Sequence, residues 1–292
     1  MSVDRLQERI RKFKNPVILD FYAQQEHIPA HILEEEGDFI SAYGRFCIEL
    51  LEGLRTVIPA VRFNFNAFSV YGVNGITLLS KVMDQASKLG YYVLLDTPEA
   101  MSLQQAKTNA DIFFTDACPW SADGLVVSSY IGTDGLKPYA ANLKSSKKSV
   151  FAVLRTPNKS AAELQDLLAG NRLAHMAQGD LVNRIAEPYI GRSGYCQVGV
   201  LGSATAADSL RNLRAKYNHL FLLVDGYDYP NANGKNCSYA FDNLGHGAAV
   251  CVGTSVTAAW SEEEADGADY IDAALRACDR IKKNLGRYIT VL

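Results

Sequence analysis

The residues of this sequence that could do chemistry are acids and one arginine within short apolar runs. Asp96 closes the run 91–96, and Arg62 lies in an earlier run, 60–65. A buried carboxylate is costly without a partner, and Arg62 is the nearest candidate partner for Asp96. Asp96 and Arg62 are therefore the candidate catalytic residues of a site for a small polar ligand.

A second conspicuous segment, 225–234, contains Asp225, Asp228, two tyrosines and two asparagines. Long polar loops of this kind often carry function, although a turn built from Gly, Pro and Asn would also explain the composition. Asp96, Asp225 and Asp228, joined by Asp20, could supply the oxygen ligands of a divalent metal ion. That metal is one hypothesis, and we otherwise expect no cofactor.

Polar side chains also follow the other apolar runs. If the runs are barrel strands, chemistry gathers where the strands end. An ordinary structural role would explain any single one of these residues equally well, but together they favour a binding site. The candidate ligand-binding residues are Asp20, Asn64, Arg155, Thr156, Asp225, Asp228, Thr254 and Ser255.

Eight apolar runs of strand type alternate with amphipathic helical stretches, which predicts a single-domain (β/α)₈ barrel over residues 1–292. Continuous apolar runs are typical of parallel strands covered by helices, and the length suits such a barrel. A doubly wound open sheet is the competing architecture. The expected strands are 16–20, 60–65, 91–96, 124–128, 149–155, 196–201, 220–225 and 247–253, and the expected helices include 39–57, 76–89, 161–168 and 206–216.

Several further elements are predicted from local patterns. An added N-terminal helix is expected at 5–13 and a last helix at 261–285. Thr97, Pro98 and Glu99 resemble a helix start, with an N-cap, a first-turn proline and an acid. The ninth apolar run, 112–114, is interpreted as part of a connection between a helix and a strand.

Composition excludes several functions. The formal charge of −3 gives no basic patch for nucleic acid, and no signal peptide or long apolar span predicts a membrane location. The protein is expected in the cytoplasm. Six cysteines without C-x-x-C spacing and five scattered histidines predict no zinc site. Phosphate recognition is poorly provided for, because no Gly-rich motif occurs and Lys235 is the cation nearest to the loops where barrels hold phosphate.

Over most of its length the sequence resembles the orotidine 5′-phosphate decarboxylases, in particular their longer bacterial branch. The order and spacing of many short markers carry the resemblance. These markers are Asp4-Arg-Leu6, Asn15-Pro-Val-Ile-Leu-Asp20, Val57-Ile-Pro-Ala-Val61, Tyr71-Gly72, Tyr130-Ile-Gly-Thr-Asp-Gly-Leu-Lys-Pro138, Glu163-Leu-Gln-Asp-Leu167, Ser193-Gly-Tyr195 and Phe221-Leu-Leu-Val224 before Gly226-Tyr227.

The resemblance implies a barrel that forms homodimers, with active sites at the interface, and decarboxylates orotidine monophosphate without a cofactor. It also implies an alternating Lys-Asp-Lys-Asp array. The first lysine falls on Arg62 and the first aspartate on Asp96, but the proton-donating lysine falls on Pro98 and the last aspartate on Met101. Asp20 matches an acid that contacts the ribose. The family's phosphate-binding glutamine and arginine fall on Pro230 and Val256.

A proline can neither stabilise nor protonate the carbanion that forms in this reaction. We therefore expect a family member that lacks the standard decarboxylase activity and acts on a different small polar ligand at the strand C-termini. Two alternatives stay open: a non-catalytic homologue that binds a ligand, nucleotide-like or otherwise, or a partner protein, and a decarboxylase that works with a substituted site.

Overall fold

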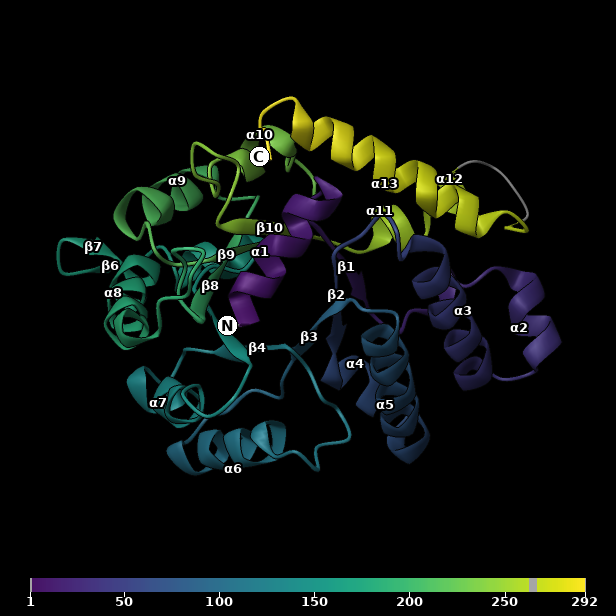
Figure 1. Cartoon of the computed structure of the whole chain (residues 1–292), viewed down its shortest axis with the longest axis horizontal. Coiled ribbons are helices and arrows are strands. Elements are labelled where there is room, and N and C mark those ends of the chain that lie inside the picture. The colour runs from purple at the N-terminus through teal and green to yellow at the C-terminus, as the bar shows by residue number, and fades with distance from the viewer. Residues whose placement is uncertain (1, 263–266, 292) are drawn as a thin grey trace.

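Eight parallel strands close into a barrel in this computed structural model, which describes residues 2–262 and 267–291. The predicted (β/α)₈ barrel is confirmed, and the open doubly wound sheet is wrong, because the first strand pairs with the last (Figure 1). The barrel strands are β1 (Val17–Phe21), β2 (Ala60–Asn64), β3 (Tyr92–Asp96), β4 (Gly124–Ser128), β5 (Ser149–Val153), β8 (Val198–Ser203), β9 (Leu222–Asp225) and β10 (Ala248–Val252).

The strands are apolar on both faces because each face meets a hydrophobic layer. In β3, Val93 and Leu95 belong to the cluster between strands and helices, whereas Tyr92 and Leu94 belong to the cluster that fills the barrel. Alternate residues of a strand point to opposite faces, so a strand buried on both sides must be a continuous apolar run.

The N-terminal helix α1 (Ser2–Phe13) closes the end of the barrel where the strands begin. Leu6 and Ile10 are fully buried in the interior cluster. Ser2 hydrogen-bonds the hydroxyl of Tyr92, the first residue of β3, and the Gln7 side chain accepts from the N–H of Gly247, just before β10. The opposite end, where the strands finish, is left open for a site.

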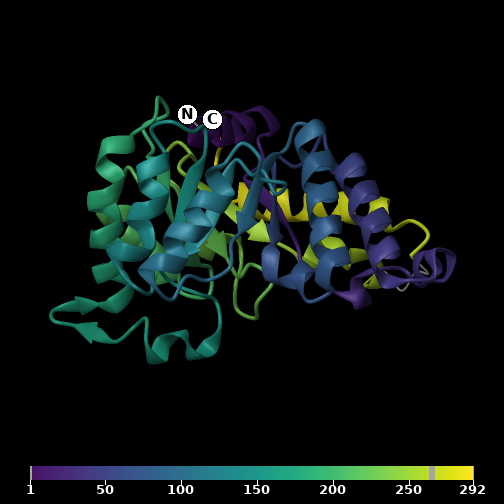
Figure 2. The same ribbon diagram turned by 90° about the horizontal axis from the view of Figure 1, so that it is seen from below.

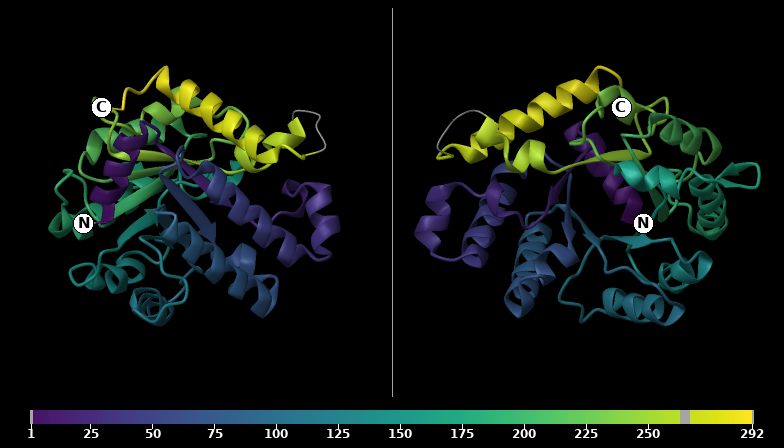
Figure 3. Two further views of the ribbon diagram at one scale, coloured as in Figure 1. Left: turned by 45° about the vertical axis from the view of Figure 1, so that its right-hand side comes forward. Right: turned by 180° about the vertical axis from the view of Figure 1, so that it is seen from behind.

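Helices surround the barrel, and the long last helix α13 lies alongside α3 and against α10, α11 and α12 (Figure 3). The predicted last helix, 261–285, is divided between α12 and α13, and its residues 263–266 lie outside the described residues. The helices are α2 (Ala30–Glu36), α3 (Phe39–Leu54), α4 (Phe65–Ser69), α5 (Gly72–Lys88), α6 (Leu103–Phe114), α7 (Thr133–Asn142), α8 (Ala174–Ala186), α9 (Ala207–Lys216), α10 (Gly234–Ser238), α11 (Thr254–Thr257), α12 (Ala259–Glu262) and α13 (Tyr270–Gly286), with 3-10 turns η1 (Gln25–His27), η2 (Lys159–Glu163) and η3 (Glu187–Tyr189).

Three local predictions are wrong. No helix begins at Thr97, because its hydroxyl and its N–H both donate to the carbonyl of Val126; α6 begins later, capped by the Ser102 side chain. The run 112–114 is the end of α6 rather than a connection. The expected helix 161–168 is instead the 3-10 turn η2 followed by β6 (Leu168–Ala169), which pairs with β7 (Arg172–Leu173).

The β6–β7 hairpin extends beyond the end of the barrel opposite to α1 and the two termini (Figure 2). It belongs to the long connection between β5 and β8, which also contains α8. Among the described residues, no helix is both long enough and apolar enough to cross a bilayer.

The role of α1 as a closure predicts a stability effect confined to one of its faces. Leu6→Ala opens a cavity in the barrel interior and should lower the free energy of unfolding by about 2–5 kcal/mol in urea denaturation. Glu8→Ala is the matched control on the exposed face; Glu8 makes one exposed ion pair with Arg192, so its loss should cost about 0–1 kcal/mol. Equal effects of the two substitutions would contradict this account.

Candidate functional site

A buried arginine lies at the centre of the site. Arg62 on β2 is 2% exposed and donates from Nε and Nη2 to the two carboxylate oxygens of Asp20 on β1, at 2.8 and 2.6 Å. The two residues lie opposite each other in the register of β1 and β2, which positions the carboxylate for a bidentate contact. The closest partner of Arg62 is therefore Asp20, not Asp96.

Two further acids reach the same guanidinium from other strands. Asp96, at the end of β3, has Oδ1 3.8 Å from Nη1 of Arg62, and Asp225, at the end of β9, has Oδ1 3.4 Å from Nη2. Nη2 also donates to the Tyr22 hydroxyl at 3.2 Å. One positive side chain thus serves three carboxylates from three different strands.

Burial and charge shift the pKa values of this cluster. Desolvation raises the pKa of Asp20 to about 7 against the opposing effect of Arg62, and desolvation also raises the pKa of Asp96. Burial alone would lower the pKa of Arg62, but Asp20 and Asp96 hold it well above its ordinary value. Because both oxygens of Asp20 accept from the guanidinium, the geometry is that of an ionised Asp20 and a charged Arg62.

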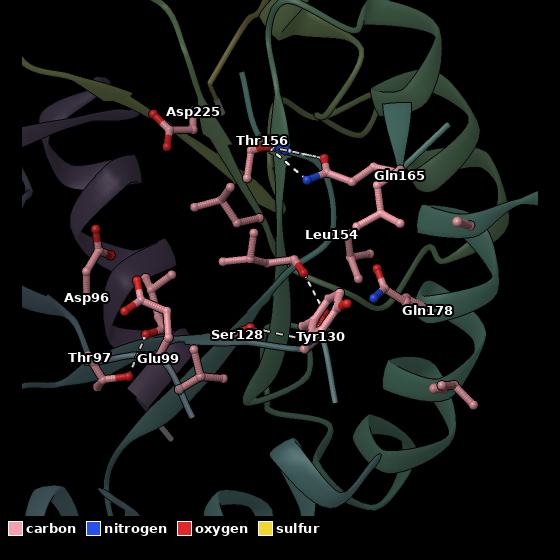
Figure 4. A pocket seen from close by; sticks show the side chains of 18 of the residues that line it. Asp96, Thr97, Glu99, Ser128, Tyr130, Leu154, Thr156, Gln165, Gln178 and Asp225 are labelled. Atoms are coloured by element: carbon pink, nitrogen blue, oxygen red, sulfur yellow. Dashed lines mark hydrogen bonds between the residues drawn. The ribbon is translucent and has the colours of Figure 1, made fainter. Parts of the chain in front are cut away.

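A cavity of about 730 Å³ opens beside Arg62 at the C-terminal ends of the strands. Figure 4 shows the carboxylates of Asp96 and Asp225 on one side of it, with Thr156, Gln165 and Gln178 on the other. The wall between them is largely apolar. Its lining includes Val126, Val127, Val153, Leu154, Leu164, Ala174, Ala177, Leu181 and Leu201, and polar side chains are supplied by Asn64, Thr97, Glu99, Ser128, Ser129 and Tyr130.

A neighbouring cavity of about 330 Å³ contains the other predicted acids. It is lined by Asp20, Asp225, Asp228 and Thr254, together with Tyr22 and Tyr227. Asp228 is already engaged, because Oδ2 accepts from the N–H of Gly253 at 2.7 Å and Oδ1 accepts from the Ser255 hydroxyl. This carboxylate occupies the start of the short helix α11, after the eighth barrel strand.

The predicted ligand residues Asn64, Arg155 and Thr156 make structural contacts. Asn64 caps α4 through the N–H of Ala67 and lies 3.4 Å from Asp96. Arg155 makes a bidentate ion pair with Asp166, at 3.0 and 2.9 Å. Thr156, which follows β5, donates from its N–H to Oε1 of Gln165 and accepts from Nε2 through its hydroxyl, and in this way it holds part of the cavity wall.

Asp166 also connects this segment to the next helices. His175 on α8 lies 3.2 Å from Asp166 through Nδ1 and 3.0 Å from the Ser209 hydroxyl through Nε2. The order of acid, imidazole and hydroxyl resembles a hydrolase triad. However, Ser209 is only 7% exposed and lines neither cavity, so these contacts fasten α8 and α9 to the segment after β5.

The described residues contain no set of side chains arranged to bind the metal ion that was one hypothesis. Within residues 2–262 and 267–291, no three His, Cys, Asp or Glu side chains form a group suited to an ion. Asp96 and Asp225 face Arg62, whereas Asp228 faces Gly253 and Ser255. The exposed Lys235 lines neither cavity.

Sequence reasoning missed several residues of the cavity. Gln165 and Gln178 come from the connection after β5, whose first part is wrongly predicted as a helix. Tyr130 follows β4 and is 60% exposed at the rim. Tyr22 follows directly after β1, and this position beside a strand end could have indicated from the sequence that it belongs to the site.

The buried ion cluster predicts a stability effect that depends on which partner is removed. Arg62→Met should lower the free energy of unfolding by about 3–5 kcal/mol, because it leaves buried carboxylates without a counter-charge. Adding Asp20→Asn to that variant removes the nearest of these charges and should recover part of the loss. Urea denaturation of the three proteins measures both effects, and an undiminished stability of Arg62→Met would contradict the role given to the pair.

Known proteins with similar sequences and similar structures have the same fold as this chain. No protein-family model matches the sequence. The chain is 27% identical over 263 residues to an orotidine 5′-phosphate decarboxylase of Rhodopirellula baltica, covering 87% of each chain, and 24% identical over 279 residues to that of Petrotoga mobilis, covering 95% of each. The crystal structure of the Plasmodium berghei orotidine 5′-monophosphate decarboxylase superposes with a TM-score of 0.79 at 15% identity, covering 99% of both chains. The chain is thus similar in sequence, over nearly its whole length, to curated orotidine 5′-phosphate decarboxylases, and the solved structure shares its fold.

Proposed function

We propose that this barrel binds a small, non-phosphorylated polar ligand at the C-terminal ends of its strands and does not carry out the standard decarboxylation of its family. The observation that carries the proposal is the engagement of Arg62. Its guanidinium is bound by Asp20 and lies near Asp96 and Asp225. The described cavity lining offers no second positive side chain to an anionic substrate.

The segment after β3 supports the loss of the family reaction. Decarboxylation leaves a carbanion that must be stabilised and protonated. Pro98 carries no proton or charge for that purpose, and its carbonyl accepts from the Asn109 side chain. Met101 is 60% exposed and supplies no carboxylate.

Asp228 supports the exclusion of phosphate. In (β/α)₈ barrels, phosphate often sits by the loops after the seventh and eighth strands, at the start of a short extra helix. Here that place follows β9 and β10, and the carboxylate of Asp228 accepts there from Gly253 and Ser255. A phosphate group would have to displace this internal anion.

The open cavity favours a ligand-binding role over a role in partner binding alone. Had the barrel mouth become only a protein interface, Tyr227, Tyr229 or Met101 would be expected to fill it. Instead, a space of about 730 Å³ stands beside Arg62, lined by none of these three side chains. This volume lies within the range of small-molecule sites, roughly 300–1,000 Å³.

The direct test adds orotidine monophosphate and follows its absorbance, with a decarboxylase of the family as positive control. Titration with uridine monophosphate measures binding of the product. We expect no turnover above the uncatalysed rate and no saturable binding, because the lining is acidic and the phosphate position is occupied. Rapid turnover would overturn the proposal.

Restoring only the lysine and aspartate of the family separates the effect of the missing proton donor on activity from the effect of the missing phosphate contacts. The variant Pro98→Lys with Met101→Asp should still show no turnover, since Pro230 and Val256 leave the phosphate without its family contacts and Asp228 remains in place. Measurable decarboxylation by this variant would show that the phosphate contacts matter less than we propose.

We also expect the homodimer that the family resemblance implies. Exposed apolar side chains beside the barrel mouth support it, because Met101 and Leu103, at the start of α6, are 60% and 42% exposed. Sedimentation velocity measures the mass, and a monomer at micromolar concentration would contradict the expectation.

A further inference from the structure

The charges around the larger cavity are strongly unbalanced. Three acids, Asp96, Glu99 and Asp225, line it together with one cation, Arg62. The charge of Arg62 is already largely neutralised by Asp20, which faces the smaller cavity. The field inside the larger cavity is therefore negative, and in a partly buried site such a field acts more strongly than it would in water.

One carboxylate oxygen at this end has no hydrogen-bond donor. Oδ1 of Asp96 is buried and accepts from no described group; its nearest positive atom is Nη1 of Arg62, 3.8 Å away. Oδ2 has only the long contact of 3.4 Å with Asn64. This oxygen lies against Arg62 and cannot be reached from the cavity, so a ligand there contacts the exposed part of Asp96, whose side chain is 18% exposed.

The remainder of the cavity suits an apolar body. Val126, Val127, Leu154 and Leu201 line the wall between the two acids and the opposite side. On that far side, the amide of Gln165 is engaged by Thr156. The side-chain amide of Gln178, by contrast, has no hydrogen-bond partner among the described residues and can serve a neutral polar group of a ligand.

We infer that the ligand of this cavity is an organic cation, in which a protonated amine lies against Asp96 and Asp225 and an uncharged apolar or aromatic body lies along the valine and leucine wall. The amine pairs with the exposed parts of the Asp96 and Asp225 carboxylates and offsets the excess of acids. This inference rests on the proposed ligand-binding function and adds the chemical class of the ligand.

The test uses three probes that share a phenylethyl body and differ in charge: phenethylamine, 2-phenylethanol and 3-phenylpropionate. Ligand-observed NMR titration of the full chain at pH 7.5 gives an affinity for each. We expect the amine to bind at least about tenfold more tightly than the alcohol, equivalent to about 1.4 kcal/mol, and the carboxylate to show no saturable binding. Equal or tighter binding of the alcohol, or no binding of the amine, would overturn the inference.

Two variants test whether the preference for the amine over the alcohol depends on Asp96. Asp96→Asn keeps the shape of the side chain and should reduce the preference for amine over alcohol by about tenfold while leaving the affinity for the alcohol unchanged. Glu163→Gln removes an equal charge from an exposed position outside the cavity lining and should leave the preference unchanged. A preference lost equally in both variants would reflect overall charge and would overturn the assignment to Asp96.

The outcomes distinguish this inference from the proposed function. Turnover of orotidine monophosphate or tight binding of uridine monophosphate would contradict the proposed function. Binding of 2-phenylethanol in this cavity without a preference for the amine would leave the proposed function standing and refute only the inferred charge of the ligand.

Discussion

The ion pair between Arg62 and Asp20 is the interaction on which the rest of the site depends. A guanidinium inside a barrel is tolerated only when carboxylates replace the water that it has lost, and each carboxylate in turn requires the guanidinium. Here the acids come from β1, β3 and β9, so the group joins strands that are far apart in the sequence. The integrity of the barrel and the electrostatics of its mouth are consequently set by the same few atoms.

The identity of the cation at position 62 shapes this arrangement. An arginine at position 62 is planar and makes bidentate contacts, whereas a lysine there would offer a compact point charge. The planar group can engage Asp20 with two nitrogens and still lie near Asp96 and Asp225. The positive charge of Arg62 is thereby balanced by carboxylates of the protein itself. The remaining negative charge of the acids then determines the electrostatic potential in the cavity.

Most of the barrel could be predicted from the sequence, because continuous apolar runs identify buried parallel strands. The ends of those runs located Asp20, Arg62, Asp96 and Asp225 at one end of the barrel. Their pairing could not be predicted: Asp20 rather than Asp96 holds Arg62, since the register of β1 against β2 decides it. The engagement of Asp228 depends on two loops placed by different strands, and no local pattern contains that information.

Barrel closure has a kinetic consequence. The first strand pairs with the last, through Val17 and Val250, and Gln7 of α1 accepts from Gly247. Contacts between such distant segments form slowly, because a long loop must close before they yield any stabilisation. On the ribosome, the strand that completes the ring emerges after all the others. Asp225 lies on β9, which β10 separates from β1, so its position beside Arg62 is completed only when this last strand joins the ring.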